Sequence, residues 1–163
     1  KIAKRKSLSI IRYVDNFVII HKDENIIREA KAEISKWLWD GPRLVLSEEK
    51  TAIRNTNKSF DFLGFTCITI TRGSSTRAKI YPSRLSQARL LLKVRQIVIN
   101  NRNASSYNLI NLLRPVIIGW ANYFRFSECS SIFSKLTHLI FQKLRAWVFR
   151  RDTRNGKKEV NQR

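Results

Sequence analysis

The stretch Ile10-Ile11-Arg12-Tyr13-Val14-Asp15-Asn16-Phe17-Val18-Ile19-Ile20 sets the architecture of the N-terminal region. Two runs of β-branched and aromatic residues flank a short polar step, a pattern typical of two antiparallel strands joined by a tight turn. Asp15 and Asn16 both tolerate the backbone of a two-residue turn. We therefore predict a β-hairpin with Asp15-Asn16 as its turn.

The residues after the hairpin predict one helix and several short strands. Apolar residues recur at intervals of three and four from about residue 24 to residue 39, which predicts an amphipathic helix that Gly41-Pro42 ends. Residues 44–46 are predicted as a short strand and residues 60–70 as a strand pair with a tight turn near Gly64. Glycine allows the backbone to bend sharply at that turn.

The next segment leads from sheet to helix. Residues 72–76 are predicted as a loop and residues 78–81 as a short strand, and Pro82-Ser83 then opens a helix that runs to about residue 100. A polar linker follows over residues 100–106. Several apolar residues of this helix, with one arginine, fall on one side: Leu85, Ala88, Leu92, Arg95 and Ile99.

The last third of the sequence is predicted to be helical. Ser105 or Ser106 caps a helix that reaches Leu113, and Pro115 suits the first turn of a second helix. A long third helix begins after residue 130 and carries a broad apolar stripe. We assign Trp120, Phe124 and Trp147 to the core of this region.

Four segments occur in an order that resembles one protein family. After the hairpin come Leu46-Ser47-Glu48-Glu49-Lys50-Thr51, then Phe60-Asp61-Phe62-Leu63-Gly64-Phe65, then Leu113-Arg114-Pro115 with Gly119-Trp120-Ala121-Asn122-Tyr123-Phe124-Arg125. Over about residues 9–155 the sequence resembles the late palm, thumb and maturase-specific domain of a group II intron reverse transcriptase. In that family the hairpin usually reads Tyr-Ala-Asp-Asp.

The resemblance implies an α+β fold built from three regions. A partial palm, with the hairpin, a helix and short strands, is expected over residues 1–76. An all-α thumb is expected over residues 77–104 and the maturase-specific helical domain X over residues 105–155. Residues 156–163 are expected to form a flexible basic tail.

The same resemblance implies that the catalytic hairpin is vestigial. Two magnesium ions in a polymerase need several carboxylate oxygens, and the family takes one aspartate from a strand upstream of the hairpin. Asp15 occupies the place of the hairpin aspartate, Asn16 replaces its acidic neighbour, and the upstream strand has no counterpart. We expect no polymerase activity, no resident metal, and a role for magnesium only if a partner chain completes the site.

Cysteine and histidine do not add a metal site. Cys67, Cys129, His21 and His138 are isolated in the sequence and form no paired set of zinc ligands. We therefore expect inert thiols in a reducing compartment and no zinc-dependent nuclease activity.

The charge distribution favours an RNA partner. The chain carries 32 Lys and Arg against 12 Asp and Glu. Residues 1–70 have a balance of +4, residues 71–163 have +16, and no acidic residue lies between Asp61 and Glu128. Such a segment binds polyanions with an affinity that falls steeply as salt rises. The simpler alternative is a solvated basic face with no dedicated ligand.

Cationic, amide and aromatic side chains of the C-terminal region are the candidate RNA contacts. Arginine and lysine bind phosphate, whereas asparagine and tyrosine contact unpaired bases. The predicted set is Arg84, Arg89, Lys93, Arg102, Arg114, Asn122, Tyr123, Arg125, Lys135, Lys143, Arg145, Arg150 and Arg151.

The leading hypothesis is a non-polymerising protein that binds structured RNA, as a splicing cofactor or a ribonucleoprotein component. One alternative is a structural component of an organellar ribosome. Another is the C-terminal piece of a split reverse transcriptase that needs a separate palm and fingers chain. The expected partners are group II intron or ribosomal RNA, with proteins of a larger ribonucleoprotein or a separate palm and fingers chain as further candidates. No membrane is expected because no apolar run approaches 18 residues.

The origin of the chain has several interpretations. The sequence begins at Lys1 and contains no methionine, which fits a processed product, a fragment, a piece of a split gene or a cleaved targeting peptide. Abundant isoleucine, asparagine and lysine suit an AT-rich genome. We expect a mitochondrial or chloroplast location, with the bacterial cytoplasm as the alternative.

Overall fold

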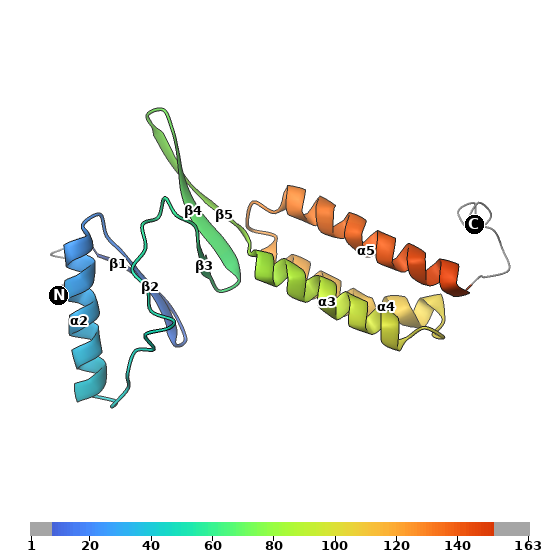
Figure 1. Ribbon diagram of the computed structural model, residues 1–163, viewed down its shortest axis with the longest axis horizontal. Coiled ribbons are helices and arrows are strands. Elements are labelled where there is room, and N and C mark those ends of the chain that lie inside the picture. Colours follow the sequence, from blue (N-terminus) through green and yellow to red (C-terminus); the bar gives the residue numbers. More distant parts are fainter. Residues whose placement is uncertain (1–7, 152–163) are drawn as a thin grey trace. The chain divides into compact units, whose positions relative to one another are not determined.

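A computed structural model describes residues 8–151 of the 163-residue chain. The chain divides into two compact units, Lys1–Asn55 and Thr56–Arg163, which we call the N-terminal and C-terminal units. The described residues form four helices and two small antiparallel sheets (Figure 1). This confirms the predicted α+β class. The limits of palm, thumb and domain X stay predictions, and the predicted tail, residues 156–163, lies outside the described residues.

The N-terminal unit contains the predicted hairpin and helix. β1 (Ser9–Tyr13) pairs with β2 (Asn16–Ile20). The predicted turn is wrong by one residue: Tyr13 pairs with Asn16, so Val14 and Asp15 form the turn. Val14 has a φ of 56°, a conformation that is unusual for a β-branched residue. The turn is thus shifted by one residue, so that β1 ends at Tyr13 and β2 begins at Asn16.

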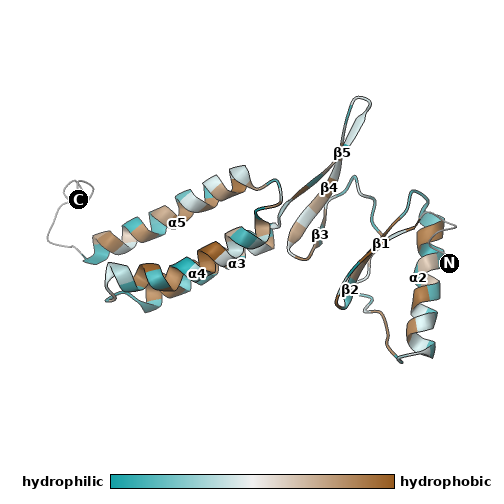
Figure 2. Ribbon diagram, turned by 180° about the vertical axis from the view of Figure 1, so that it is seen from behind, coloured by the Kyte–Doolittle hydropathy of each residue, from teal (hydrophilic) through white to brown (hydrophobic). Residues whose placement is uncertain are grey.

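Helix α2 (Glu24–Asp40) follows the hairpin and confirms the prediction. The side chain of Asp23 caps it by accepting a hydrogen bond from the Asn25 N–H. Gly41 lies at its C-terminal end, where its N–H donates to the Trp37 carbonyl at 3.1 Å. In Figure 2, apolar bands alternate with polar ones along this helix.

None of the described residues of the N-terminal unit is buried. Ile10, Ile11 and Tyr13 are 53%, 54% and 61% exposed, and Trp37 is 68% exposed. The predicted strand at residues 44–46 is wrong, because this segment is irregular and no described strand pairs with it. An extended apolar segment becomes a strand only where a neighbouring strand completes its hydrogen bonds.

The sheet of the C-terminal unit consists of β3 (Phe60–Phe62), β4 (Phe65–Arg72) and β5 (Ser75–Pro82) in that order. The predicted strand pair is confirmed. Its turn is formed by Leu63 and Gly64, with φ of 49° and 81°. The predicted loop at residues 72–76 is shorter than expected, since β4 and β5 remain paired as far as Arg72 and Ser75.

Three helices follow: α3 (Arg84–Asn100), α4 (Ser106–Phe124) and α5 (Ser130–Arg151). Ser83 and Ser105 are the caps of α3 and α4, as predicted. The predicted break before Pro115 is wrong, because α4 continues through it. Proline removes one backbone hydrogen bond, and packing of both halves of the helix into one core offsets that loss.

The core of the C-terminal unit lies between these three helices. Its buried members come from α3, α4 and α5: Leu90, Val94, Val98, Leu109, Leu113, Leu136, Ile140 and Trp147. Trp147 is 5% exposed, which confirms its assignment to the core, and Phe124 is 4% exposed. Trp120 is partly buried against the same cluster.

The predicted apolar side of α3 is not the side that packs. Leu85 and Leu92 are 57% and 54% exposed, whereas Leu90 and Val94 are buried. Because α3 carries apolar residues on both sides, periodicity alone does not select one of them. Within residues 8–151, no helix has the length and apolar character needed to cross a bilayer.

Candidate nucleic-acid interface

Hydrogen bonds join the β3–β4 turn to the start of α3. The carbonyl of Gly64 accepts from the backbone N–H of Ser83 and from the hydroxyl of Ser86, each at 2.9 Å. The hydroxyl of Ser83 caps α3 by accepting from the Ser86 N–H at 3.1 Å, and it donates to the Ser86 hydroxyl at 3.0 Å. The capping residue that the sequence indicates for α3 thus also holds the turn.

The same turn is attached to the C-terminal end of α4. The hydroxyl of Tyr123 donates to the carbonyl of Leu63 at 2.9 Å. The ring of Tyr123 stacks on Phe65 with centroids 5.4 Å apart, and Phe124 meets Phe65 edge-on at 4.7 Å. Gly64 has no room for a side chain, since an added Cβ would lie 2.9 Å from the Ser86 hydroxyl.

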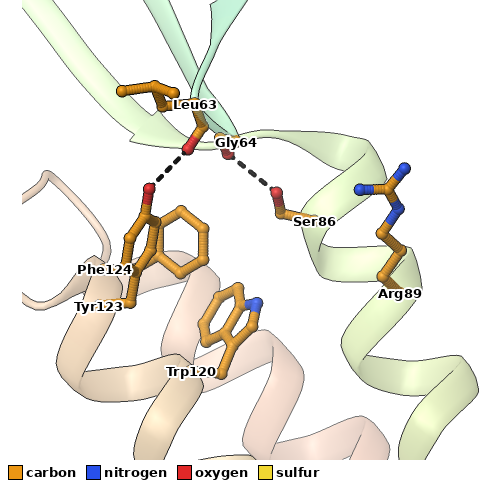
Figure 3. Close-up of a pocket in the computed structure, with 7 residues that line it drawn as sticks. All are labelled: Leu63, Gly64, Ser86, Arg89, Trp120, Tyr123 and Phe124. Atoms are coloured by element: carbon orange, nitrogen blue, oxygen red, sulfur yellow. Dashed lines mark hydrogen bonds between the residues drawn. The ribbon is translucent and has the colours of Figure 1, made fainter. Parts of the chain in front are cut away.

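These contacts surround an open depression of about 510 Å³ (Figure 3). Its walls come from the β3–β4 turn, α3 and α4: Leu63, Gly64, Ser86, Arg89, Trp120, Tyr123 and Phe124. Trp120 packs on Phe124 with ring centroids 4.5 Å apart. Its indole Nε1 is buried and has no hydrogen-bond partner among the described residues. The depression therefore combines aromatic surface, an unsatisfied donor and one arginine.

A second cavity, of about 490 Å³, lies where the α3–α4 loop meets the end of α5. Arg102, Arg150 and Arg151 line it together with Asn103 and Trp147. The Arg151 guanidinium lies 4.7 Å from the centroid of the Trp147 ring. The structure thus brings Arg102 close to Arg150 and Arg151, two other predicted RNA contacts that lie almost 50 residues further along the sequence.

The predicted RNA-contacting residues are distributed over all three helices and their loops. They are exposed, with the exception of Lys143, which is half-buried. Arg77 pairs with Glu128 at 2.9 Å, and in the described part of the C-terminal unit this is the only ion pair. The predicted cations therefore face solvent without a described carboxylate, and their contact with RNA stays a prediction.

Phe126 is not among the RNA contacts that were predicted from the sequence. This side chain follows α4 and is 86% exposed, and the guanidinium of Arg125 lies 4.5 Å from its ring centroid. An exposed aromatic ring under an arginine is suited to stacking on a base. The sequence clue is an aromatic residue beyond the last turn of a helix, next to a predicted phosphate ligand.

Two polar residues of the hairpin, Asp15 and Asn16, contact each other. Asp15 and Asn16 are exposed, and the Asn16 side-chain amide donates to the Asp15 carboxylate at 2.9 Å. Among residues 8–151, no three His, Cys, Asp or Glu side chains gather where they could hold a metal ion. Elsewhere, burial raises the pKa of the Cys67 thiol above its ordinary value, and the Asp61 carboxylate raises it further.

A basic surface with exposed aromatic rings is characteristic of nucleic-acid-binding proteins. Residues 87–163, just under half of the chain, match the family model of the group II intron maturase-specific domain. The match confirms that this part of the chain corresponds to the C-terminal part of a group II intron maturase. No curated protein matches the chain.

Proposed function

We propose that the chain binds structured RNA through its C-terminal unit, without polymerising nucleotides, as a splicing cofactor or a ribonucleoprotein component. One observation carries the proposal. The unit that contains the maturase-specific match exposes almost all of its predicted cations, and only one described ion pair neutralises any arginine there.

The electrostatics explain why RNA is the favoured ligand. Residues 71–163 carry 19 basic and 3 acidic residues, a balance of +16, so this region of the chain concentrates positive charge. Phosphate contacts release counterions and reduce this self-repulsion. The exposed rings of Tyr123 and Phe126 add surfaces on which unpaired bases stack.

A salt series of filter-binding measurements with a structured intron RNA tests the proposal. The affinity should fall steeply with salt, and the double variant Arg102→Gln/Arg150→Gln should reduce the slope by about one to two. A matched control, Lys31→Gln/Lys36→Gln in α2, should leave the slope unchanged. Absent binding, or binding that does not depend on salt, would contradict the proposal.

Crosslinking and sedimentation distinguish intron RNA from ribosomal RNA as the partner. A splicing cofactor should crosslink in cells to intron sequences and not to ribosomal RNA. A structural ribosomal component should remain with ribosomal RNA in stoichiometric amount through sedimentation at high salt. We place the splicing role first because the match is to a maturase-specific domain.

A second candidate function is that of one piece of a split reverse transcriptase. The exposed apolar residues of β1 favour it, because strands that are apolar on both faces are normally covered on both sides. Primer extension by this chain with a separate palm and fingers chain is the test. Loss of activity in Asp15→Ala would support this function, and unchanged activity would exclude Asp15 as a metal ligand.

A further inference from the structure

We propose that the depression lined by the β3–β4 turn, α3 and α4 binds a single unpaired base of the RNA. This inference rests on the proposed RNA binding and adds a defined subsite to it. The depression is open, about 510 Å³ in volume, and lies wholly within the C-terminal unit. A flat base that has left its helix can enter it, whereas a paired base is held within its duplex.

The unsatisfied donor of Trp120 indicates what the depression lacks. A buried N–H without an acceptor destabilises the folded state, and most buried polar groups in proteins are paired. Figure 3 shows the Nε1 edge of the indole directed toward the α3 side of the depression. Because this atom is shielded from solvent, the indole must turn before a carbonyl oxygen or ring nitrogen of a base can accept from it.

The walls provide the remaining chemistry for a nucleotide. Tyr123, which is 54% exposed, and the partly buried Trp120 supply aromatic surface, whereas Phe124 is only 4% exposed and contributes little. Arg89 stands at the α3 side, is exposed, and has no described carboxylate partner, so it is available to the phosphate of the same nucleotide. None of the described residues that line the depression is acidic. The positive charge of Arg89 favours an anionic ligand such as a nucleotide over a cationic one.

The depression is also held in shape before any ligand binds. Both carbonyls of the turn are occupied, since Gly64 accepts from Ser86 and Leu63 accepts from Tyr123. Walls that are already ordered lose little conformational entropy on binding. The subsite therefore contributes selectivity for an unpaired base in addition to the salt-dependent phosphate contacts.

The test compares two hairpin RNAs that differ at one position. One carries a single bulged uridine and the other a bulged abasic nucleotide, so the phosphate backbone is the same. Base stacking is worth about 1–3 kcal/mol, which corresponds to a preference of roughly 5- to 150-fold for the uridine RNA. Trp120→Phe should reduce this preference, and the control Trp37→Phe, at an exposed tryptophan, should retain it.

A second pair of variants keeps the test informative if Trp120→Phe does not fold. Arg89→Gln, at an exposed position on the rim, should weaken binding of the uridine RNA more than Arg95→Gln on the same helix. Equal affinity of the unaltered protein for both RNAs would overturn the base subsite and leave the proposed function standing. Failure to bind either RNA would overturn both.

Discussion

The two units of this chain both contain many apolar residues, but the described residues form a buried core only in the C-terminal unit. The described part of the N-terminal unit contains isoleucines and tryptophans, and none of its side chains is buried. The C-terminal unit buries a cluster drawn from three helices, in which Val94 has no exposed surface. Apolar composition therefore does not by itself make a core; apolar surfaces from several elements must meet.

This difference has an energetic consequence. Full burial of a Val, Leu or Ile side chain is worth about 1.5–3 kcal/mol, and the C-terminal unit has several such residues. The described part of the N-terminal unit has a two-stranded hairpin and one helix of 17 residues, both of which are marginal alone in water. We expect its stability to depend on whatever covers its apolar side chains.

Hydrogen exchange should show the largest contrast. Amides of β1, β2 and α2 should exchange with opening free energies near zero, whereas amides around Val94 should require global unfolding of their unit. For a stability of about 5 kcal/mol, exchange at Val94 slows by roughly a thousandfold or more. Mass spectrometry of peptides from both units measures this, and equal protection in the two would break the comparison.

Truncation of a core leucine should give the next largest effect. Leu109 is 2% exposed, and Leu109→Ala should lower the free energy of unfolding by about 2–5 kcal/mol because it removes buried surface and leaves a cavity. Its neighbour Ile110 is 58% exposed, and Ile110→Ala should change stability by less than about 0.5 kcal/mol. Urea denaturation followed by helical circular dichroism compares them. Similar losses would show that α4 does not pack as described.

Substitution of Gly64, with Gly119 as the control, tests the turn that supports the depression. Gly64→Ala should cost about 1–3 kcal/mol, because φ is 81° and the new Cβ would lie 2.9 Å from the Ser86 hydroxyl. Gly119→Ala on α4 meets no atom within 4 Å and should stabilise the unit by up to about 1 kcal/mol. Thermal unfolding of both variants is the measurement. A stabilised Gly64→Ala would argue against the turn geometry.

Loss of a surface ion pair should have the smallest effect on the free energy of unfolding, in both units. The Glu24–Arg28 pair of α2 and the Glu128–Arg77 pair of the C-terminal unit both lie at the surface. Glu24→Gln and Glu128→Gln should each change the free energy of unfolding by less than about 1 kcal/mol. This result would assign the difference between the units to apolar burial. A loss of several kcal/mol in Glu128→Gln would instead give ion pairing a structural role.

Much of the local structure was predictable because it depends on nearby residues. Ser83 and Ser105 cap helices, Gly41 follows the end of α2, and Gly64 lies in a tight turn, as their sequence context indicates. The basic bias of the C-terminal region is likewise a property of composition. The resemblance to a maturase is confirmed over residues 87–163, whereas palm identity in the N-terminal unit stays a prediction.

The errors share a cause, which is that strand pairing and helix packing override the preference of a single residue or short segment. Val14 lies in the turn because Tyr13 pairs with Asn16, and residues 44–46 remain irregular because no described strand pairs with them. Pro115 stays within α4 because the helix packs on both sides of it.

Residues close together in the sequence were enough to predict the caps at Ser83 and Ser105, where positive charge accumulates, and which family the last part of the chain resembles. Caps and charge are properties of neighbouring residues, so they can be recognised locally. The side of α3 that is buried, and the hydrogen bond from Tyr123 to Leu63, sixty residues away, are known only from the folded structure. Both depend on which surfaces pack together, and the depression beside Trp120 exists because they do.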